Sequence, residues 1–257
     1  MRTRTNSRRR VTALIAAAGK GTRLGAEVPK AFVTLRERSL VERSIAVMIT
    51  SGVVDEIVVL ISPEMEAYAA DLLGRRGLLD GGEVPVRLVH GGGERADSVW
   101  RGLQAIDDTE GVVLIHDSAR ALTPPGLVAR VAREVLAGHV GVVPVLPVAD
   151  TIKRIDSPGG TAVAETPSRA LLRAVQTPQG FDLATLRAAN RAYFAAQNPG
   201  FEATDDASLL EWRGQPVVCV PGDPMAFKVT TPMDMMLART IVDEVEPTVF
   251  DVPGGAS

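Results

Sequence analysis

Apolar runs of strand length alternate with amphipathic segments of helix length over the first 147 residues of the chain. The predicted strands cover residues 11–17, 56–62, 86–92, 112–117 and 140–147. Because strands and helices alternate along the chain, the pattern predicts an α/β fold with a doubly wound, mostly parallel, Rossmann-like sheet. In such a sheet, ligands bind outside the carboxyl ends of the strands, so the polar residues that follow each strand are the candidates for function.

Local signals mark where several predicted helices begin and end. Ser39 with Glu42 three positions later forms a capping box, and Gly52 ends the same helix. Thr231 and Pro232 have the residue types of a helix cap and a first helical position. Further helices are predicted at 63–77, 94–106, after 126, at 182–197 and at the TDDAS stretch, with one more strand at 216–220.

The regular alternation stops after Pro147, where residues 148–170 predict an arm. Within it, two short alternating segments are joined by Ser157, Pro158, Gly159 and Gly160, which are turn residues. A lone hairpin is only marginally stable in water, so the arm needs something to pack on. We expect a second copy of the chain in this role, making a homodimer; packing on its own domain is the alternative.

The composition is that of an ordinary globular protein, with 46% hydrophobic and 23% charged residues among 257. We expect one domain at 11–245, a disordered basic tail at 1–10 and a flexible tail at 246–257. The formal net charge of −3 argues against a nucleic-acid partner. No apolar run reaches membrane-spanning length and no signal peptide is evident, so no membrane partner is expected either. The single cysteine, Cys219, predicts a buried, inert thiol in a cytoplasmic protein.

The loop after the first strand, AAAGKGTRLGAEVPK, is rich in glycines and cations. Glycines let backbone amides approach a ligand closely, and a loop between a parallel strand and a helix is a natural anion cradle. Lys20, Arg23 and Lys30 add positive charge that a neutral ligand does not need. The spacing matches neither a Walker A loop nor a GxGxxG fingerprint. The loop therefore predicts phosphate binding, against the plainer reading of a tight turn with solvated charges.

Three later stretches place polar residues where a phosphorylated ligand would lie. HGGGERADS offers close backbone approach and the hydroxyl of Ser98, although a simple turn explains it equally. In LIHDSAR, Asp117 follows an apolar strand and could bind magnesium together with phosphate oxygens and waters. Arg120 could hold a phosphate, or simply pair with Asp117. Lys228 lies in an apolar stretch and could point into a cleft or only occupy a strand face.

The sequence offers cations, glycines and one metal-type carboxylate, but no recognisable nucleophile or cysteine-rich metal cluster. This inventory suits a reaction at phosphorus, where catalysis is mostly positioning and charge neutralisation.

Seven stretches in this order are shared with one family: AAAGKGTRLGAEVPKAF, GGGERADSV, HDSAR, DTIKR, VQTPQGF, TDDASLLE and FKVTTPMD. From Val11 to about Val245, the chain resembles the 2-C-methyl-D-erythritol 4-phosphate cytidylyltransferases of the nucleotidyltransferase superfamily. The resemblance implies transfer of CMP from CTP to 2-C-methyl-D-erythritol 4-phosphate, with release of pyrophosphate, in non-mevalonate isoprenoid synthesis. It also implies dependence on Mg²⁺ and a homodimer with interlocking arms.

The resemblance assigns a role to each matching residue. Those expected at the nucleotide are Ala17, Ala18, Gly19, Gly92, Ser98 and Arg120, of which Gly92 and Ser98 read the cytosine. Those expected to be catalytic are Arg23, Lys30 and Lys228, with Asp117 as the magnesium ligand. Those expected at the second substrate are Thr151, Arg169, Thr177 and Thr204, with Thr151, Arg169 and Thr204 reaching it across the dimer interface.

The chain departs from the family pattern at three positions near these residues. Gly93 stands where an acidic residue is common, which puts one polar contact to the nucleotide in doubt. Ser118 replaces a usual alanine beside Asp117, and Ala226 replaces an asparagine that would support Lys228. None of these departures removes a charge that the reaction needs.

Three other functions compete with this one. A sibling transferase would act on another polyol or sugar phosphate. A regulatory protein on the same scaffold would bind CTP without chemistry, although binding alone does not need cations on both sides of the α-phosphate. A nicotinamide-dependent reductase would need a different glycine spacing.

Overall fold

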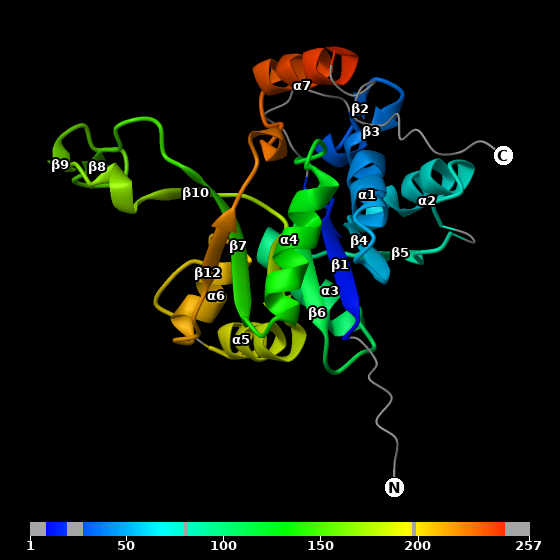
Figure 1. The fold of residues 1–257 in the computed structure, drawn as a ribbon, viewed down its shortest axis with the longest axis horizontal. Helices are drawn as coiled ribbons and strands as arrows, with labels where there is room; N and C mark the ends of the chain where they lie inside the picture. Colours follow the sequence, from blue (N-terminus) through cyan, green and yellow to red (C-terminus); the bar gives the residue numbers. More distant parts are fainter. Residues whose placement is uncertain (1–8, 20–27, 80–81, 197–198, 245–257) are drawn as a thin grey trace, which may run out of the picture.

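The computed structural model describes residues 9–19, 28–79, 82–196 and 199–244, and its centre is an eight-stranded sheet (Figure 1). The strands are β1 Val11–Ala16, β4 Glu56–Ile61, β5 Val86–His90, β6 Val112–Asp117, β7 Gly141–Pro147, β10 Arg173–Val175, β11 Gln179–Asp182 and β12 Val218–Pro221. Their order is β10-β7-β11-β6-β1-β4-β5, with β12 against β7. The pairs β1–β4, β1–β6, β4–β5 and β7–β12 are parallel, which confirms the predicted mostly parallel α/β fold.

Helices cover both faces of the sheet, as a doubly wound fold requires. On one face lie α1 Leu40–Thr50, α2 Glu66–Arg75 and α4 Pro125–Leu136. On the other face lie α3 Arg95–Ala105, α5 Leu183–Ala195 and α6 Asp206–Trp212. Neighbouring residues of one strand point to opposite faces, so Val112 and Leu114 join the first core while Val113 and Ile115 join the second.

The predicted helix signals form real contacts. The Ser39 hydroxyl accepts from the backbone N–H of Glu42, and the Glu42 carboxylate accepts from the backbone N–H of Ser39 at 2.7 Å. Gly52 follows this helix with a φ of +65°, a conformation that glycine adopts without strain. The last helix, α7 Pro232–Glu244, begins at the predicted proline, and its Thr231 hydroxyl accepts from the Asp234 N–H.

Two strands of the sheet were not predicted and run antiparallel to their neighbours. β11 lies between β6 and β7, and β10 pairs with the end of β7. Both are short and carry polar residues, so they lack the apolar run that marked the parallel strands. The prediction for Cys219 was partly wrong: it does lie in a strand, β12, but its side chain is exposed.

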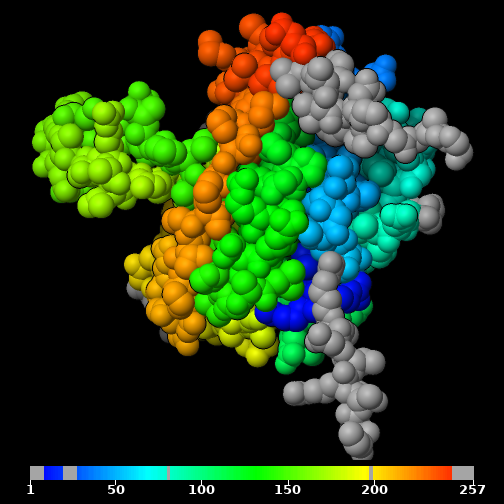
Figure 2. Space-filling model, in the orientation of Figure 1, coloured from blue at the N-terminus to red at the C-terminus, as the bar shows by residue number. Residues whose placement is uncertain are grey.

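The arm protrudes from the domain as a separate lobe (Figures 1 and 2). Its hairpin consists of β8 Arg154–Ile155 and β9 Val163–Glu165, which pair antiparallel as predicted. The apolar side chains of Ile155, Val163 and Leu171 are exposed, with Leu171 at 85%. The arm therefore has little core of its own.

The remaining elements are short. They are η2 Lys30–Phe32, β2 Thr34–Leu35, β3 Arg38–Ser39, η3 Pro63–Met65, η4 Arg169–Leu171 and η5 Pro224–Ala226. In the part of the chain that the structure describes, no helix is both long enough and apolar enough to span a bilayer.

The predicted tails lie mostly outside the described residues. The description begins at Arg9, whose guanidinium donates to the carbonyl oxygen of Gly111 at 2.6 Å and pairs with Asp182. Arg10 lies near the carboxylates of Glu56 and Asp108, at 3.5 and 3.4 Å. Of the predicted tails at 1–10 and 246–257, only Arg9 and Arg10 are among the described residues.

Candidate active site

A cavity of about 250 Å³ lies at the carboxyl ends of the parallel strands, where an α/β sheet places its ligands. Its lining includes eight of the predicted site residues: Ala17, Ala18, Gly19, Lys30, Gly92, Ser98, Asp117 and Lys228. These residues come from four segments that are far apart in the sequence. The fold thus brings together the described ends of the glycine loop, two of the predicted cations and the predicted metal ligand.

The first wall of the cavity continues from the end of β1. Ala17 stays on the sheet, because its N–H donates to the carbonyl oxygen of Leu60 at 2.9 Å. Gly19 then reaches the cavity, and no atom of the described residues lies within 4 Å of the place where its Cβ would stand. Lys30 enters the same cavity from the start of η2, which is anchored by the buried ring of Phe32. Arg23 lies outside the described residues.

The second wall is the glycine turn between β5 and α3. The buried hydroxyl of Ser98 accepts from the N–H of Gly92 at 3.0 Å and donates to the carbonyl oxygen of Glu94 at 2.9 Å. A Cβ on Gly92 would lie 2.3 Å from the Cβ of Asp97, so the turn has no room for a side chain there. At Gly93, no atom of the described part of the chain lies within 4 Å of a Cβ position. The side chain that is missing at this departure from the family would have pointed into open space.

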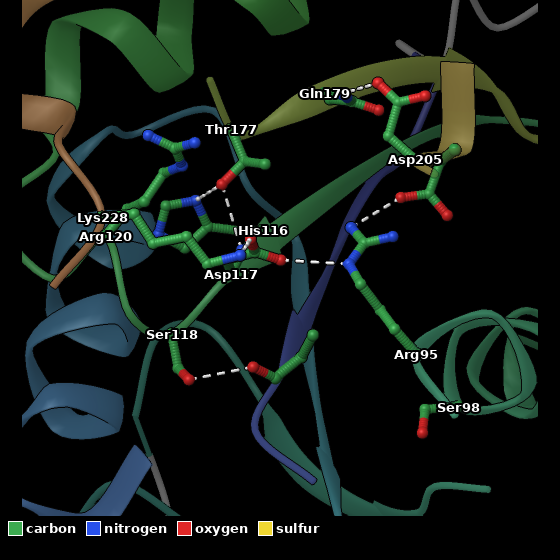
Figure 3. A network of polar contacts seen from close by, with 12 residues as sticks. Arg95, Ser98, His116, Asp117, Ser118, Arg120, Thr177, Gln179, Asp205 and Lys228 are labelled. Carbon is green, nitrogen blue, oxygen red and sulfur yellow. Dashed lines mark hydrogen bonds and ion pairs between the residues drawn. The ribbon is translucent and has the colours of Figure 1, made fainter. Parts of the chain in front are cut away.

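Asp117 ends β6 and forms the charged floor of the cavity (Figure 3). Its Oδ2 accepts from Lys228 Nζ at 2.7 Å, and its Oδ1 accepts from Arg95 Nε at 3.2 Å. Burial alone would raise the pKa of the Asp117 carboxyl, but the charges of Arg95 and Lys228 outweigh burial and hold its pKa well below the usual range. Asp117 is therefore an anion at neutral pH, with both oxygens engaged by cations.

Arg95 and Asp206 belong to this site, although the sequence analysis did not single them out. Arg95 comes from the first turn of α3 and lines the cavity, while its Nη2 lies 2.7 Å from Oδ2 of Asp206. The Asp206 side chain is only 3% exposed. The sequence does contain a signal for both residues. Arg95 is the one arginine at the helix start in GERADS, and Asp206 is the second acid at the helix start in TDDAS. Only the fold shows that these two helix starts face each other.

Behind Asp117, a buried hydroxyl and a buried imidazole support the strand end. Thr177 Oγ1 accepts from the backbone N–H of Asp117 at 3.1 Å and lies 3.1 Å from Nδ1 of His116. Burial lowers the pKa of His116 to about 4, against the opposing charge of Asp117, so the ring is neutral at pH 7. Thr177 was predicted to contact the substrate; in the structure it is 5% exposed and its hydroxyl holds the backbone beneath Asp117.

Four other predicted residues do not line the cavity. Arg120 donates through Nη1 to the carbonyl oxygen of Ala226 at 2.7 Å and through Nη2 to that of Val175 at 3.3 Å. It thus connects the base of the arm to the segment that leads to Lys228. The other three predicted residues are exposed: Thr151 and Arg169 lie in the arm, and Thr204 lies before α6.

The other two departures from the family each take part in a hydrogen bond. The Ser118 hydroxyl donates to the carbonyl oxygen of Ala16 at 2.9 Å, which ties the ends of β6 and β1 together. Ala226 is fully buried, and its carbonyl oxygen accepts the bond from Arg120. Arg120 therefore supports the segment before Lys228 through the backbone.

The described residues contain no group of three or more His, Cys, Asp or Glu side chains that could enclose a metal ion. A divalent cation at this site would thus take one protein carboxylate, Asp117, and most of its ligands from elsewhere. That donor set fits Mg²⁺, which commonly keeps waters and phosphate oxygens. It does not fit a structural zinc site, which needs four protein ligands.

A doubly wound sheet with a cationic, glycine-walled cavity at its strand ends defines an α/β protein that binds a phosphorylated ligand. Comparison with known proteins makes the class specific. Residues 11–244 match the family model of 2-C-methyl-D-erythritol 4-phosphate cytidylyltransferase. The chain therefore belongs to this family.

Relatives and solved structures agree with the family model. A protein of this name from Corynebacterium efficiens is 69% identical over 249 residues, which are 96% of this chain and 99% of the relative. Another from Nocardia farcinica is 50% identical over 91% of this chain and 94% of its own. The crystal structure of this cytidylyltransferase from Thermus thermophilus has a TM-score of 0.70 at 37% identity, covering 91% of this chain and 99% of that one.

The glycine turn gives a test with a matched control. We expect Gly92→Ala to lower the free energy of unfolding by about 1–3 kcal/mol, because its Cβ must displace the backbone and side chain of Asp97. Gly93→Ala, one residue away with open space around it, should change stability by no more than about 0.5 kcal/mol. Urea unfolding measures both. Equal losses in the two variants would contradict the close packing described for Gly92.

Proposed function

We propose that this protein transfers CMP from CTP to 2-C-methyl-D-erythritol 4-phosphate and releases pyrophosphate, as a step of isoprenoid precursor synthesis. Membership of the cytidylyltransferase family supports this, as do relatives of that name at up to 69% identity. The observation that carries the proposal is the cavity in which Lys30, Lys228 and Asp117 meet two glycine-lined walls. Such a cavity suits a polyphosphate and a second anion.

The chemistry that these residues can perform is charge neutralisation. The attacking group is a phosphate and is already an anion, so no general base is needed for in-line attack on the α-phosphorus of CTP. The difficulty is to bring two anions together while charge spreads over the phosphate oxygens. Lys30 and Lys228 approach the cavity from separate elements and can stabilise that charge from two sides. Arg23 is proposed as a third cation of this set.

Asp117 is the proposed magnesium ligand, together with phosphate oxygens of CTP. When bound, magnesium neutralises charge on the phosphate chain. Lys228 now bonds to Asp117, and its side chain is 42% exposed at the cavity. An incoming phosphate can therefore draw the Lys228 ammonium toward itself, because the ammonium would exchange one anionic oxygen, on Asp117, for another on the phosphate.

The choice of cytosine is proposed to depend on the turn at Gly92 and Ser98. Cytosine presents an exocyclic amine that donates, where uracil presents a carbonyl that accepts. A backbone or hydroxyl acceptor placed at this position would favour CTP, because UTP would leave two acceptors facing each other. Ala17, Ala18 and Gly19 are proposed to lie against the nucleotide, with Arg120 as a neighbour that supports Lys228.

The arm is proposed to form the homodimer and to complete the second substrate's site. Its exposed apolar residues, among them Ile152 and Leu171, need cover. Thr151, Arg169 and Thr204 are proposed to contact the methylerythritol phosphate, together with Thr177. We place the reaction in the cytoplasm; a single cysteine, which cannot form an internal disulfide, supports this.

A screen for pyrophosphate release tests the proposed activity. The four nucleoside triphosphates are offered with Mg²⁺ and a panel of polyol and sugar phosphates. We expect turnover with CTP and 2-C-methyl-D-erythritol 4-phosphate, and none when CTP, acceptor or metal is omitted. Turnover only with ribitol phosphate or a hexose 1-phosphate would assign the protein to a sibling transferase. CTP binding without turnover of any acceptor would favour a regulatory protein.

Lys30 tests the catalytic use of the cations. Lys30→Ala should lower kcat by about 100-fold or more while changing the Kd for CTP far less, because its charge is needed most when charge develops in the transition state. Steady-state kinetics gives the first quantity and calorimetric titration with CTP the second. Equal losses in kcat and in affinity would show that Lys30 only binds the ground state.

Mixed dimers test the shared site. If each site combines Lys30 of one subunit with Arg169 of the other, a dimer of one Lys30→Ala and one Arg169→Ala subunit contains one intact site. We expect the two inactive variants to regain activity when they are unfolded and refolded together, relative to each refolded alone. Mixing that forms heterodimers without restoring any turnover would contradict a site completed by the arm.

A further inference from the structure

We propose that Asp206 is a positioning residue of this site: it holds the Arg95 guanidinium and thereby lets Asp117 exchange that cation for a divalent metal. The inference rests on the proposed function, because it concerns the metal that CTP brings. Neither the family match nor the sequence analysis gave Asp206 a role.

Arg95 bridges two acids that come from different parts of the fold. Its Nε donates to Oδ1 of Asp117 at 3.2 Å at the end of β6, and its Nη2 lies 2.7 Å from Oδ2 of Asp206 at the start of α6. The arginine side chain is 32% exposed, while those of Asp117 and Asp206 are 11% and 3% exposed. Of the two carboxylates that pair with Arg95, that of Asp206 is thus the more deeply buried and that of Asp117 the more exposed.

The position of Asp206 is fixed by contacts that do not involve Arg95. Asp205 caps α6, since its Oδ1 accepts from the N–H of Ser208 at 2.9 Å. Gln179 of β11 donates to Oδ2 of Asp205 at 2.8 Å and accepts from the N–H of Ala207 at 3.2 Å. The residues on either side of Asp206 are therefore held to the sheet, and its buried carboxylate has a fixed place.

The charges explain why a fixed buried acid matters. Asp117 has one oxygen on Lys228 and the other on Arg95, so a metal ion at Asp117 must compete with positive charge at both oxygens. A buried arginine left without any carboxylate is costly. Because Arg95 also pairs with Asp206, it can release Asp117 and still keep an ion pair. Without Asp206, Arg95 would have Asp117 as its remaining carboxylate and would compete with the metal for it.

This reasoning predicts that Asp206→Asn weakens metal binding through Arg95. Enzyme with CTP and no acceptor is titrated with Mn²⁺, and free Mn²⁺ is followed by electron paramagnetic resonance, with a titration of CTP alone subtracted. We expect the Kd for Mn²⁺ to rise about tenfold or more, the usual cost of losing a partner behind a metal ligand. Glu211→Gln is the matched control: it removes an acid from the same helix, but one that is exposed, while Arg95 pairs with Asp117 and Asp206.

A second variant separates positioning from a general loss of structure. In the double variant Arg95→Met with Asp206→Asn, the competing cation is gone, so Mn²⁺ should again bind as tightly as to the wild type. Arg95→Met alone should likewise bind Mn²⁺ no more weakly than the wild type. Thermal unfolding of each variant accompanies the titrations, and the two variants without Arg95 carry the test if Asp206→Asn does not fold.

Two results would overturn the inference. One is a Kd for Mn²⁺ in Asp206→Asn equal to that in Glu211→Gln. The other is weak Mn²⁺ binding that persists when Arg95 is removed, which would mean that Arg95 supports the metal site. Failure of the proposed function looks different, because then the wild-type protein itself would release no pyrophosphate from CTP in the presence of the acceptor.

Discussion

The site depends on one buried carboxylate, Asp117, at the end of a central strand. An anion there is stable only because Arg95 and Lys228 supply positive charge within hydrogen-bonding distance. The same arrangement prepares the site for its ligand. Each of the two cations now bonds to one oxygen of Asp117 and would compete there with a metal, and each has a second acidic partner: an incoming phosphate for Lys228 and the fixed acid Asp206 for Arg95. Charge in the proposed reaction is thus redistributed among groups that are already in place.

The sheet makes this arrangement possible by ending several parallel strands at one edge. β1 delivers the first glycine wall, β5 leads to the second, and β6 ends in Asp117 itself. The added antiparallel strand β11 has a separate use, because Gln179 on it braces the start of α6. Thr177, just before β11, bonds to the backbone of Asp117. The segment that contains Thr177 and β11 therefore holds Asp117 and the start of α6 in place, while the parallel strands position the two glycine walls.

Much of this could be predicted from the sequence, and the reasons are local. Long apolar strands and capping signals such as Ser39 with Glu42 depend on neighbouring residues, so the parallel strands and most helices were found. Short strands such as β11 exist through pairing with distant segments and have no such signal. Likewise, Arg95 and Asp206 stand 111 positions apart in the sequence, and only tertiary packing makes them partners. Cys219 was predicted to be buried, yet its side chain is exposed on β12, which pairs with β7.

If the cations around Asp117 change partners when the nucleotide binds, a crystal structure of the protein with CTP and Mg²⁺ will show the exchange. We expect a triphosphate between the glycine walls, the metal on Asp117, Lys228 turned to a phosphate oxygen and Arg95 kept by Asp206. A nucleotide bound elsewhere, with Lys228 and Arg95 still on Asp117, would rule out the exchange.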